Sequence, residues 1–282
     1  MQVVRYRDAQ LFLERARSFL LGAEAENNLI LGIVGMVPSF GDHAYLATVE
    51  SDGAVVACAL RTPPYKAVIS SAEAQAIACL VTDLAEKYPD LAQVYGPDAA
   101  VMNFADLWSQ RTGVPSVQGT RHRLFEIREA PHLVTPPQGA LRPATESDLP
   151  TIIAWTTAFI VEALPGDPTD PVKHATHRIA TRSLFVWEDG KPVSMAGWAG
   201  KTPSGVRVNF VYSPPEYRSR GYATACVSAL TRQLLDEGHT FCCLYTDLSN
   251  PTSNRIYQRI GYRPVADSSD YLLNSRKGGS IR

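Results

Sequence analysis

Two spacings of apolar residues alternate along this chain. Apolar positions three and four residues apart predict amphipathic helices, and short runs of β-branched and aromatic residues between turn signals predict strands. The clearest helix covers 72–88, with Ser70 or Ser71 as its N-cap. The full set comprises helices at 10–36 (two, broken at 22–28), 72–88, 99–111, 149–163, 172–181, 223–237 and 251–260, and strands at 44–50, 55–61, 66–70, 91–95, 121–128, 140–142, 184–188, 193–199, 207–212, 241–247 and 271–273.

The two halves of the chain share one order of elements. Each has two helices, a hairpin, a further strand, a long helix, a strand, a shorter helix and a last strand, which indicates a tandem duplication. The segments 108–113 (WSQRTG) and 256–261 (IYQRIG) occupy matching places. A stretch with three prolines lies between the halves, so we expect a domain at 1–130, a linker at 131–139 and a second domain at 140–282.

One stretch of the second half suggests a binding site for an anion. The strand at 207–212 must end before Pro214-Pro215, and a helix begins at Ala223. Between them, Arg218 and Arg220 flank the start of the helix together with Gly221. The first turn of a helix presents free N–H groups and a partial positive charge, so this arrangement favours a phosphate or pyrophosphate.

Two motifs of the second half resemble signatures of the GNAT superfamily of N-acyltransferases. The first is Arg-x-x-Gly-x-Ala at 218–223, which is similar to the acyl-CoA pyrophosphate loop, and the second is YTDLSNPTSNRIYQRIGYRPV at 245–265. The resemblance implies an α+β chain of two GNAT-like domains, each a mixed and mostly antiparallel sheet flanked by helices. It also implies acetyl-CoA as co-substrate. The cofactor-binding residues implied are Phe210, Val211, Tyr212, Arg218, Ser219, Arg220, Gly221, Tyr222, Ala223, Thr224, Asn250 and Asn254.

The resemblance further implies that the strands at 207–212 and 241–247 part at their C-terminal ends to admit acyl-CoA. The first half passes from its strand near Ser70 directly into a helix, without arginines or glycine where 218–223 would fall. We therefore expect the first domain to be a degenerate copy that binds no CoA.

The helix at 251–260 would carry the general acid. Asn254 and Tyr257 lie three residues apart and so share one face of that helix. The resemblance assigns Asn254 to the cofactor and gives Tyr257 the role of protonating the departing CoA thiolate. Two simpler interpretations stand beside these roles: Asn250 before Pro251 is a helix N-cap, and Tyr257 is a core tyrosine.

The sequence identifies no general base. Some relatives carry a glutamate on the central strand where this chain has Asn209. Possible substitutes are Glu162, Glu216, His174 and His177, each of which could equally be a solvated surface residue. His174 and His177 are also spaced for a metal pair, but the sequence offers no third ligand nearby, so we expect two surface histidines and no metal. A backbone N–H near Val211 or Tyr212 could stabilise the oxyanion.

The composition argues against some classes of binding partner but does not identify the acceptor. The net charge of −1 argues against a nucleic acid or an anionic membrane as the main target. The five cysteines include no C-x-x-C pair, and the longest apolar run, 29–37, is too short for a membrane span, so we expect a cytoplasmic protein. The oligomeric state stays open.

From these features we expect an acetyl-CoA-dependent N-acetyltransferase that acts by direct attack of a primary amine, on a small molecule or a peptide. The rival hypothesis is a non-catalytic CoA-binding sensor or assembly module. Both would bind acetyl-CoA, and only the first would release thiol steadily when an amine is present.

Overall fold

The computed structural model describes residues 1–36, 43–131 and 135–273, and the chain in it forms two compact units. Unit 1 contains Met1–Leu124, Asp247–Ser249 and the described residues from Val265 onward, and unit 2 contains Phe125–Thr246 and Asn250–Pro264. These units differ from the sequence ranges 1–130 and 140–282. Unit 1 includes 247–249 and the segment from Val265, and unit 2 already begins at Phe125. Part of the predicted linker, 132–134, lies outside the described residues.

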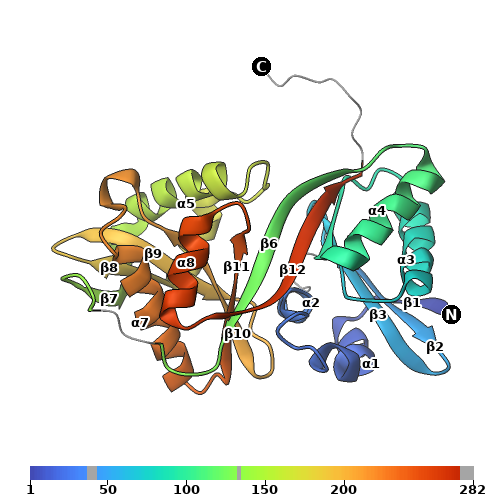
Figure 1. Cartoon of the computed structure of the whole chain (residues 1–282), viewed down its shortest axis with the longest axis horizontal. Helices are drawn as coiled ribbons and strands as arrows, with labels where there is room; N and C mark the ends of the chain where they lie inside the picture. Colours follow the sequence, from blue (N-terminus) through green and yellow to red (C-terminus); the bar gives the residue numbers. More distant parts are fainter. Residues whose placement is uncertain (37–42, 132–134, 274–282) are drawn as a thin grey trace. The chain divides into compact units, whose positions relative to one another are not determined.

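Unit 1 is a mixed sheet with helices on both faces (Figure 1). Its strands, in spatial order, are β1 (Gln2–Tyr6), β2 (Tyr45–Ser51), β3 (Ala54–Arg61), β4 (Ala67–Ile69), β5 (Gln93–Pro97), β12 (Arg263–Leu272) and β6 (Val117–Ile127). Its helices are α1 (Ala9–Leu21), α2 (Asn28–Val34), α3 (Ala74–Lys87) and α4 (Asp98–Thr112). Tyr45 and Ala47 pack in the core with α3 and α4, and Leu46 between them points to the face where α1 lies.

Local chemistry explains most element ends of unit 1. Asp52 and Gly53 both have positive φ, 51° and 77°, as the two-residue hairpin between β2 and β3 requires. The predicted cap of α3 is wrong: Glu73 is the N-cap residue, and the Ser70 hydroxyl instead accepts a hydrogen bond from the Cys58 amide at 2.9 Å. The short strand β1 was not predicted.

Unit 2 has the same layered construction. Its strands, in spatial order, are the end of β6, then β11 (Phe241–Asp247), β10 (Gly205–Tyr212), β9 (Pro192–Ala199), β8 (Leu184–Glu188) and β7 (Ala140–Pro143). Its helices are η2 (Glu146–Asp148), α5 (Leu149–Ala163), α6 (Pro171–Ala180), η3 (Pro215–Tyr217), α7 (Tyr222–Asp236) and α8 (Pro251–Ile260).

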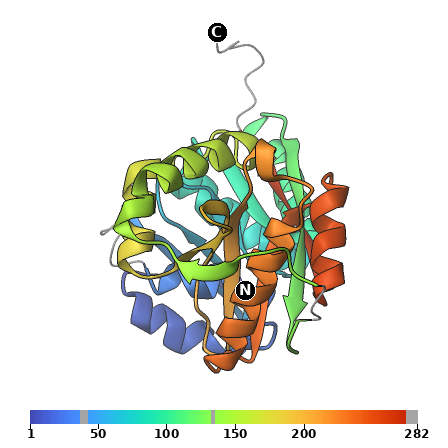
Figure 2. The ribbon, with the colours of Figure 1, turned by 90° about the vertical axis from the view of Figure 1, so that its left-hand side faces the viewer.

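Alternation along the strands of unit 2 builds two cores. Phe185 and Trp187 of β8 pack with α7 and α8, whereas Leu184 and Val186 pack with α5 and α6. The two helix pairs therefore cover opposite faces of the sheet. In Figure 2 they can be followed by colour, yellow-green for α5 and α6 and orange to red for α7 and α8.

The last strand corrects the prediction of a short strand at 271–273. β12 begins at Arg263, and Ser268–Leu272 pair in antiparallel register with β5 of unit 1. Polar residues fill most of this strand because unit 1 supplies them with partners. The Asp270 carboxylate accepts from Lys66 at 2.9 Å, and the Ser269 hydroxyl donates to Asp98 at 2.6 Å.

The two halves repeat one order of elements, as the sequence indicated, and the predicted α+β class is confirmed. Corresponding helices α4 and α8 both end at a glycine in the left-handed region, Gly113 (φ 73°) and Gly261 (φ 112°). Within the described residues, no helix combines the length and apolarity that crossing a membrane requires.

Candidate functional site

The middle of unit 2 opens where β10 and β11 part. Their parallel register joins Gly205–Arg207 to Phe241–Cys243, and within the described residues it extends no further. On its other side β10 pairs with β9, but the register jumps between Asn209 and Tyr212. Phe210 and Val211 form the bulge and have no partner in the β9 register. The ends of the two strands therefore separate, and backbone groups of the bulge are left for another partner.

The bulge is held by aromatic packing. Phe210 has a φ of 50°, a rare value for a residue with a bulky side chain. Its ring stacks on the His174 ring of α6, with centroids 4.1 Å apart, and lies 4.8 Å from the ring of Phe159 in α5. These contacts explain how the strained residue is retained. The bulge also places Asn209 and Phe210 on the same face, toward α5 and α6.

The predicted phosphate loop leads from β10 through η3 into α7. Ser219 and Gly221 have φ values of 61° and 83°, and Gly221 is the N-cap residue of α7. It lacks a side chain, and no described side chain caps the helix, so the first-turn amides stay open to a ligand. A Cβ on Gly221 would meet Pro137 only at 3.8 Å. The glycine is required by its φ and not by crowding from the protein.

The two arginines of the loop have different surroundings. Arg218 forms an ion pair with Glu162 of α5 at 2.7 Å and donates to the Ser213 carbonyl at 2.9 Å. Glu162 also accepts from the Tyr212 hydroxyl at 3.3 Å. Arg220 is exposed and forms no ion pair with a described residue; its guanidinium lies 6.0 Å from the Tyr217 ring. Arg220 is therefore the loop cation that can meet an anion without first breaking a salt bridge.

The side chains of Asn250 and Asn254 form hydrogen bonds at the start of α8. The Asn250 side chain accepts from the Ser253 amide at 3.1 Å, so Asn250 is the N-cap that the sequence indicated. The Asn254 side chain donates to the Asn250 carbonyl at 2.9 Å and accepts from the Thr246 hydroxyl. Its oxygen and nitrogen are both engaged within the unit, which favours a structural role for Asn254.

Tyr257 lies on the core face of α8. It is 8% exposed and packs near Phe125 and Tyr262, with ring centroids 6.5 and 6.1 Å away. No hydrogen bond joins its hydroxyl to another described residue. Burial raises the pKa of Tyr257 above its ordinary value, so the phenol holds its proton at neutral pH and can donate it.

The candidate bases on α5 and α6 differ in exposure, and one of them, His174, is not the surface residue that was expected. His177 is exposed, but His174 is half-buried against Phe210, and its Nε2 is buried without a partner. Burial, with Arg178 close by, lowers the pKa of His174 to about 4. Glu162 is already paired with Arg218. Within the described residues no cluster of His, Cys, Asp and Glu could hold a metal ion.

Sequence reasoning missed Arg178. This arginine of α6 is 5% exposed and donates to the Trp198 carbonyl and to the Asn209 side-chain oxygen, both at 2.7 Å. The position at which some relatives carry a glutamate therefore holds an amide bound to a buried cation. No spacing in the sequence connects the two residues, which are 31 positions apart.

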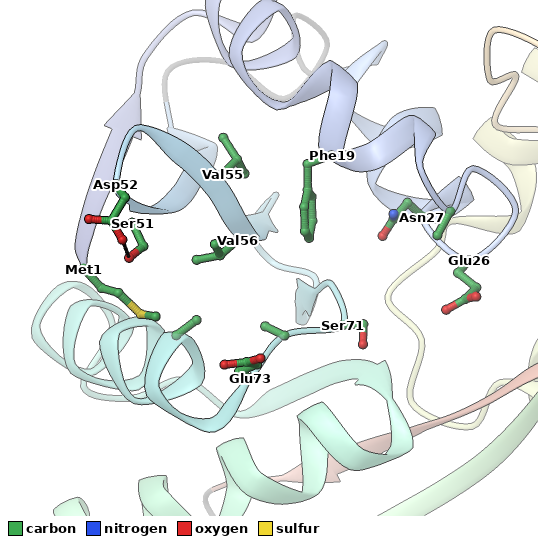
Figure 3. Close-up of a pocket in the computed structure, with 13 residues that line it drawn as sticks. Met1, Phe19, Glu26, Asn27, Ser51, Asp52, Val55, Val56, Ser71 and Glu73 are labelled. Carbon is green, nitrogen blue, oxygen red and sulfur yellow. Dashed lines mark hydrogen bonds between the residues drawn. The ribbon is translucent and has the colours of Figure 1, made fainter.

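The corresponding region of unit 1 is acidic. A cavity of about 740 Å³ lies beside the start of α3, at the place that matches the phosphate loop of unit 2 (Figure 3). Its described lining includes the carboxylates of Glu26, Asp52 and Glu73 and no lysine or arginine side chain. Such a lining repels a pyrophosphate.

Comparison with known proteins agrees with this architecture. A family model described as "FR47-like protein" matches residues 186–271. A GCN5-related N-acetyltransferase from Sphaerobacter thermophilus is similar over 82% of this chain and 81% of its own, at 16% identity and a TM-score of 0.60. A protein titled "tandem GNAT protein from the clavulanic acid biosynthesis pathway" is similar over 97% of this chain and 98% of its own, at 12% identity and a TM-score of 0.59.

The chain has the tandem GNAT fold. A Drosophila protein of known structure matches with a TM-score of 0.65 at 12% identity, over 96% of this chain and 98% of its own. No curated protein matches this sequence. Within the tandem GNAT fold, the parted strands and the open helix start described above belong to the second copy, and the acidic cavity belongs to the first.

Proposed function

We propose that this chain is an N-acetyltransferase that uses acetyl-CoA, with its one acetyl-CoA site in unit 2. The observation that carries the proposal is the parting of β10 from β11 directly before the uncapped start of α7 at Gly221. A long, thin ligand with amides in its middle and a pyrophosphate at one end matches such a site. The strand edge would take the amides, and the helix start would take the phosphates.

The backbone of the bulge supplies the amide pairing. Phe210 and Val211 have no β9 partners, whereas the Tyr212 carbonyl already accepts from the Ser194 hydroxyl at 3.1 Å. We therefore assign the pantetheine chain mainly to Phe210 and Val211. The N–H groups from Ser219 to Thr224 would hold the pyrophosphate, since the Arg218 N–H already donates to the Pro215 carbonyl, and Arg220 would add a positive charge.

The reaction is direct attack of an amine nitrogen on the thioester carbonyl. The C–N bond forms as the C–S bond breaks, nitrogen gives up one proton, and sulfur gains one. Tyr257 donates the proton to sulfur, and the proton lost from nitrogen restores the phenol by way of solvent. The bulge N–H groups are placed to stabilise the oxyanion. A thiolate is a good leaving group, so the phenol assists the step without being indispensable.

Two measurements test the proposal. Isothermal titration should find one acetyl-CoA site per chain, and a panel of amines should give steady CoA release with at least one acceptor. Tight binding without release for every amine would favour the non-catalytic CoA-binding module instead. Two sites per chain would place a second acetyl-CoA in unit 1. That result would contradict the expectation that the acidic cavity of unit 1 repels the pyrophosphate.

A further inference from the structure

Arg178 is a buried cation without a buried anion. It is 5% exposed, and among the described residues no carboxylate lies within ion-pair distance of its guanidinium. Its Nε is buried and has no partner. Buried arginines are rarely tolerated unless they are paired, because removing the charge from water is costly. A function that needs a positive charge at this place would account for it.

Strand β9 provides both the space and a hydrogen-bond acceptor for this guanidinium. A Cβ on Gly197 of β9 would lie 2.3 Å from Nη2 of Arg178, so only glycine leaves room there. The Trp198 carbonyl accepts from Nη1, and the Phe210 ring centroid lies 6.0 Å from the guanidinium carbon. Burial and the nearby charge of Arg207 lower the pKa of Arg178 to about 10, which still leaves the group charged at neutral pH.

Arg178 fixes the orientation of the Asn209 amide. A guanidinium can only donate hydrogen bonds, so the atom of Asn209 that faces it at 2.7 Å must be the oxygen. The nitrogen then faces the other way, and no described residue accepts from it. Asn209 is half-buried and lies next to the bulge, on the face toward α5 and α6. It presents two N–H donors at this point and cannot take a proton from an amine.

We propose that Asn209, held by Arg178, binds the carboxylate of the acceptor, so that the substrate class is amines with a carboxylate near the nitrogen, such as amino acids. This inference rests on the proposed function and specifies its acceptor. The charge of Arg178, which no described carboxylate neutralises, favours an anion over a neutral carbonyl group. Arg178 is too deeply buried to touch the acceptor, so it acts as a positioning residue for Asn209.

The test compares acceptors that share one side chain and differ in the carboxylate, such as leucine, leucinamide and isoamylamine, with kcat/KM expressed per neutral amine because their amine pKa values differ. The wild type should show kcat/KM about 10- to 100-fold higher for the amino acid, mainly through KM, as expected for hydrogen bonds to a charged group. Asn209→Asp should reverse the preference for the amino acid, because the introduced carboxylate pairs with Arg178 and repels the carboxylate of the acceptor. Equal kcat/KM for all three acceptors, or an unchanged preference in Asn209→Asp, would overturn the inference.

Variants of Arg178 separate positioning from a purely structural role. Arg178→Lys keeps a donor for the Asn209 oxygen and should keep the preference, whereas Arg178→Met should lose it. Because Arg178 lies beside the Phe210 ring of the bulge, acetyl-CoA affinity is measured for both variants and the acceptors are compared at saturating acetyl-CoA. A structural role alone would lower the rate for all acceptors alike and leave the ratio intact, and that result would remove Arg178 from the proposal. If Arg178→Met does not fold, Asn209→Asp and Asn209→Leu still decide the question.

A binding measurement keeps this inference separate from the proposed function. N-acetyl-leucine and N-acetyl-isoamylamine are titrated into the CoA-bound protein, which requires no turnover. Tighter binding of the carboxylate-bearing product to the wild type, lost in Asn209→Asp, supports the carboxylate site even if no amine releases CoA. Equal binding together with CoA release from unrelated amines would refute the carboxylate site while leaving the acetyltransferase proposal intact.

Discussion

Replacing Gly221 by valine should weaken acetyl-CoA binding while the protein still folds. The residue sits at φ 83°, where an L-residue costs about 1–2 kcal/mol, and a β-branched side chain falls at the upper end. A Cβ would meet only Pro137, at the ordinary contact distance of 3.8 Å, so packing adds no further penalty. The variant relieves the strain by moving the exposed loop to negative φ, and binding must then restore the original conformation.

That cost sets the size of the effect. A conformational penalty of about 1–2 kcal/mol raises Kd by about 5- to 30-fold, and we expect valine near the higher value. Gly166→Val is the matched control, because Gly166 has a φ of 84° in the turn after α5 of the same unit with no atom within 4 Å of the added Cβ. Isothermal titration with acetyl-CoA should show the loss in Gly221→Val only. An unchanged Kd there, or an equal loss in Gly166→Val, would refute the assignment of the pyrophosphate to this loop.

Three further predictions concern charge and proton transfer. Arg220→Ala should weaken acetyl-CoA binding more than Arg218→Ala, since Arg218 is already paired, and both losses should shrink at high salt; the opposite ranking would contradict the reasoning. Tyr257→Phe should lower kcat by about 10²-fold with little change in acetyl-CoA affinity, and full kcat under chemistry-limited conditions would leave Tyr257 a core residue. Hydrogen bonds from Arg142 lower the pKa of the buried Asp148 to about 2, so its stabilisation is complete above about pH 5 and is lost as the pH falls toward 2. Asp148→Asn should therefore cost about 2 kcal/mol in urea unfolding at pH 7 and about half as much at pH 3, and an equal cost at both would be inconsistent with this ion pair.

Periodicity predicted the helices and the hairpins because their signals are local. The Asn250 cap, which the sequence indicated, is present, and like the glycine ends of α4 and α8 it depends on neighbours within a few residues. The strand β12 was mostly missed because Asp267, Ser268, Ser269 and Asp270 look like a loop until their partners are known. Those partners lie about 140 to 200 positions earlier in the chain, as the pairs formed by Arg123 and Lys66 illustrate.

In the candidate site, too, the features with local signals could be predicted and those that depend on long-range contacts could not. The loop at 218–223 could be predicted because backbone conformation and one glycine define it. The bulge at Phe210 could not, since its positive φ is imposed by rings from α5 and α6 and not by a permissive residue. The Arg178–Asn209 contact joins a helix to a strand with neither residue in a recognisable motif. Long-range contacts therefore determine the bulge and the Arg178–Asn209 pair, whereas local chemistry determines the loop at 218–223.

The place of β12 in unit 1 has a consequence for how the chain is made. Its residues Ser268–Leu272 supply the neighbour of β5, so the sheet of unit 1 stays incomplete until these residues have left the ribosome. Before residues 268–272 have been synthesised, β5 presents an open edge, which is prone to pair with other chains. Closing it requires contacts across more than 170 residues, a slow step for a folding chain. A gene fragment that ends at residue 130 should consequently give an aggregating product, although each half resembles a domain in sequence.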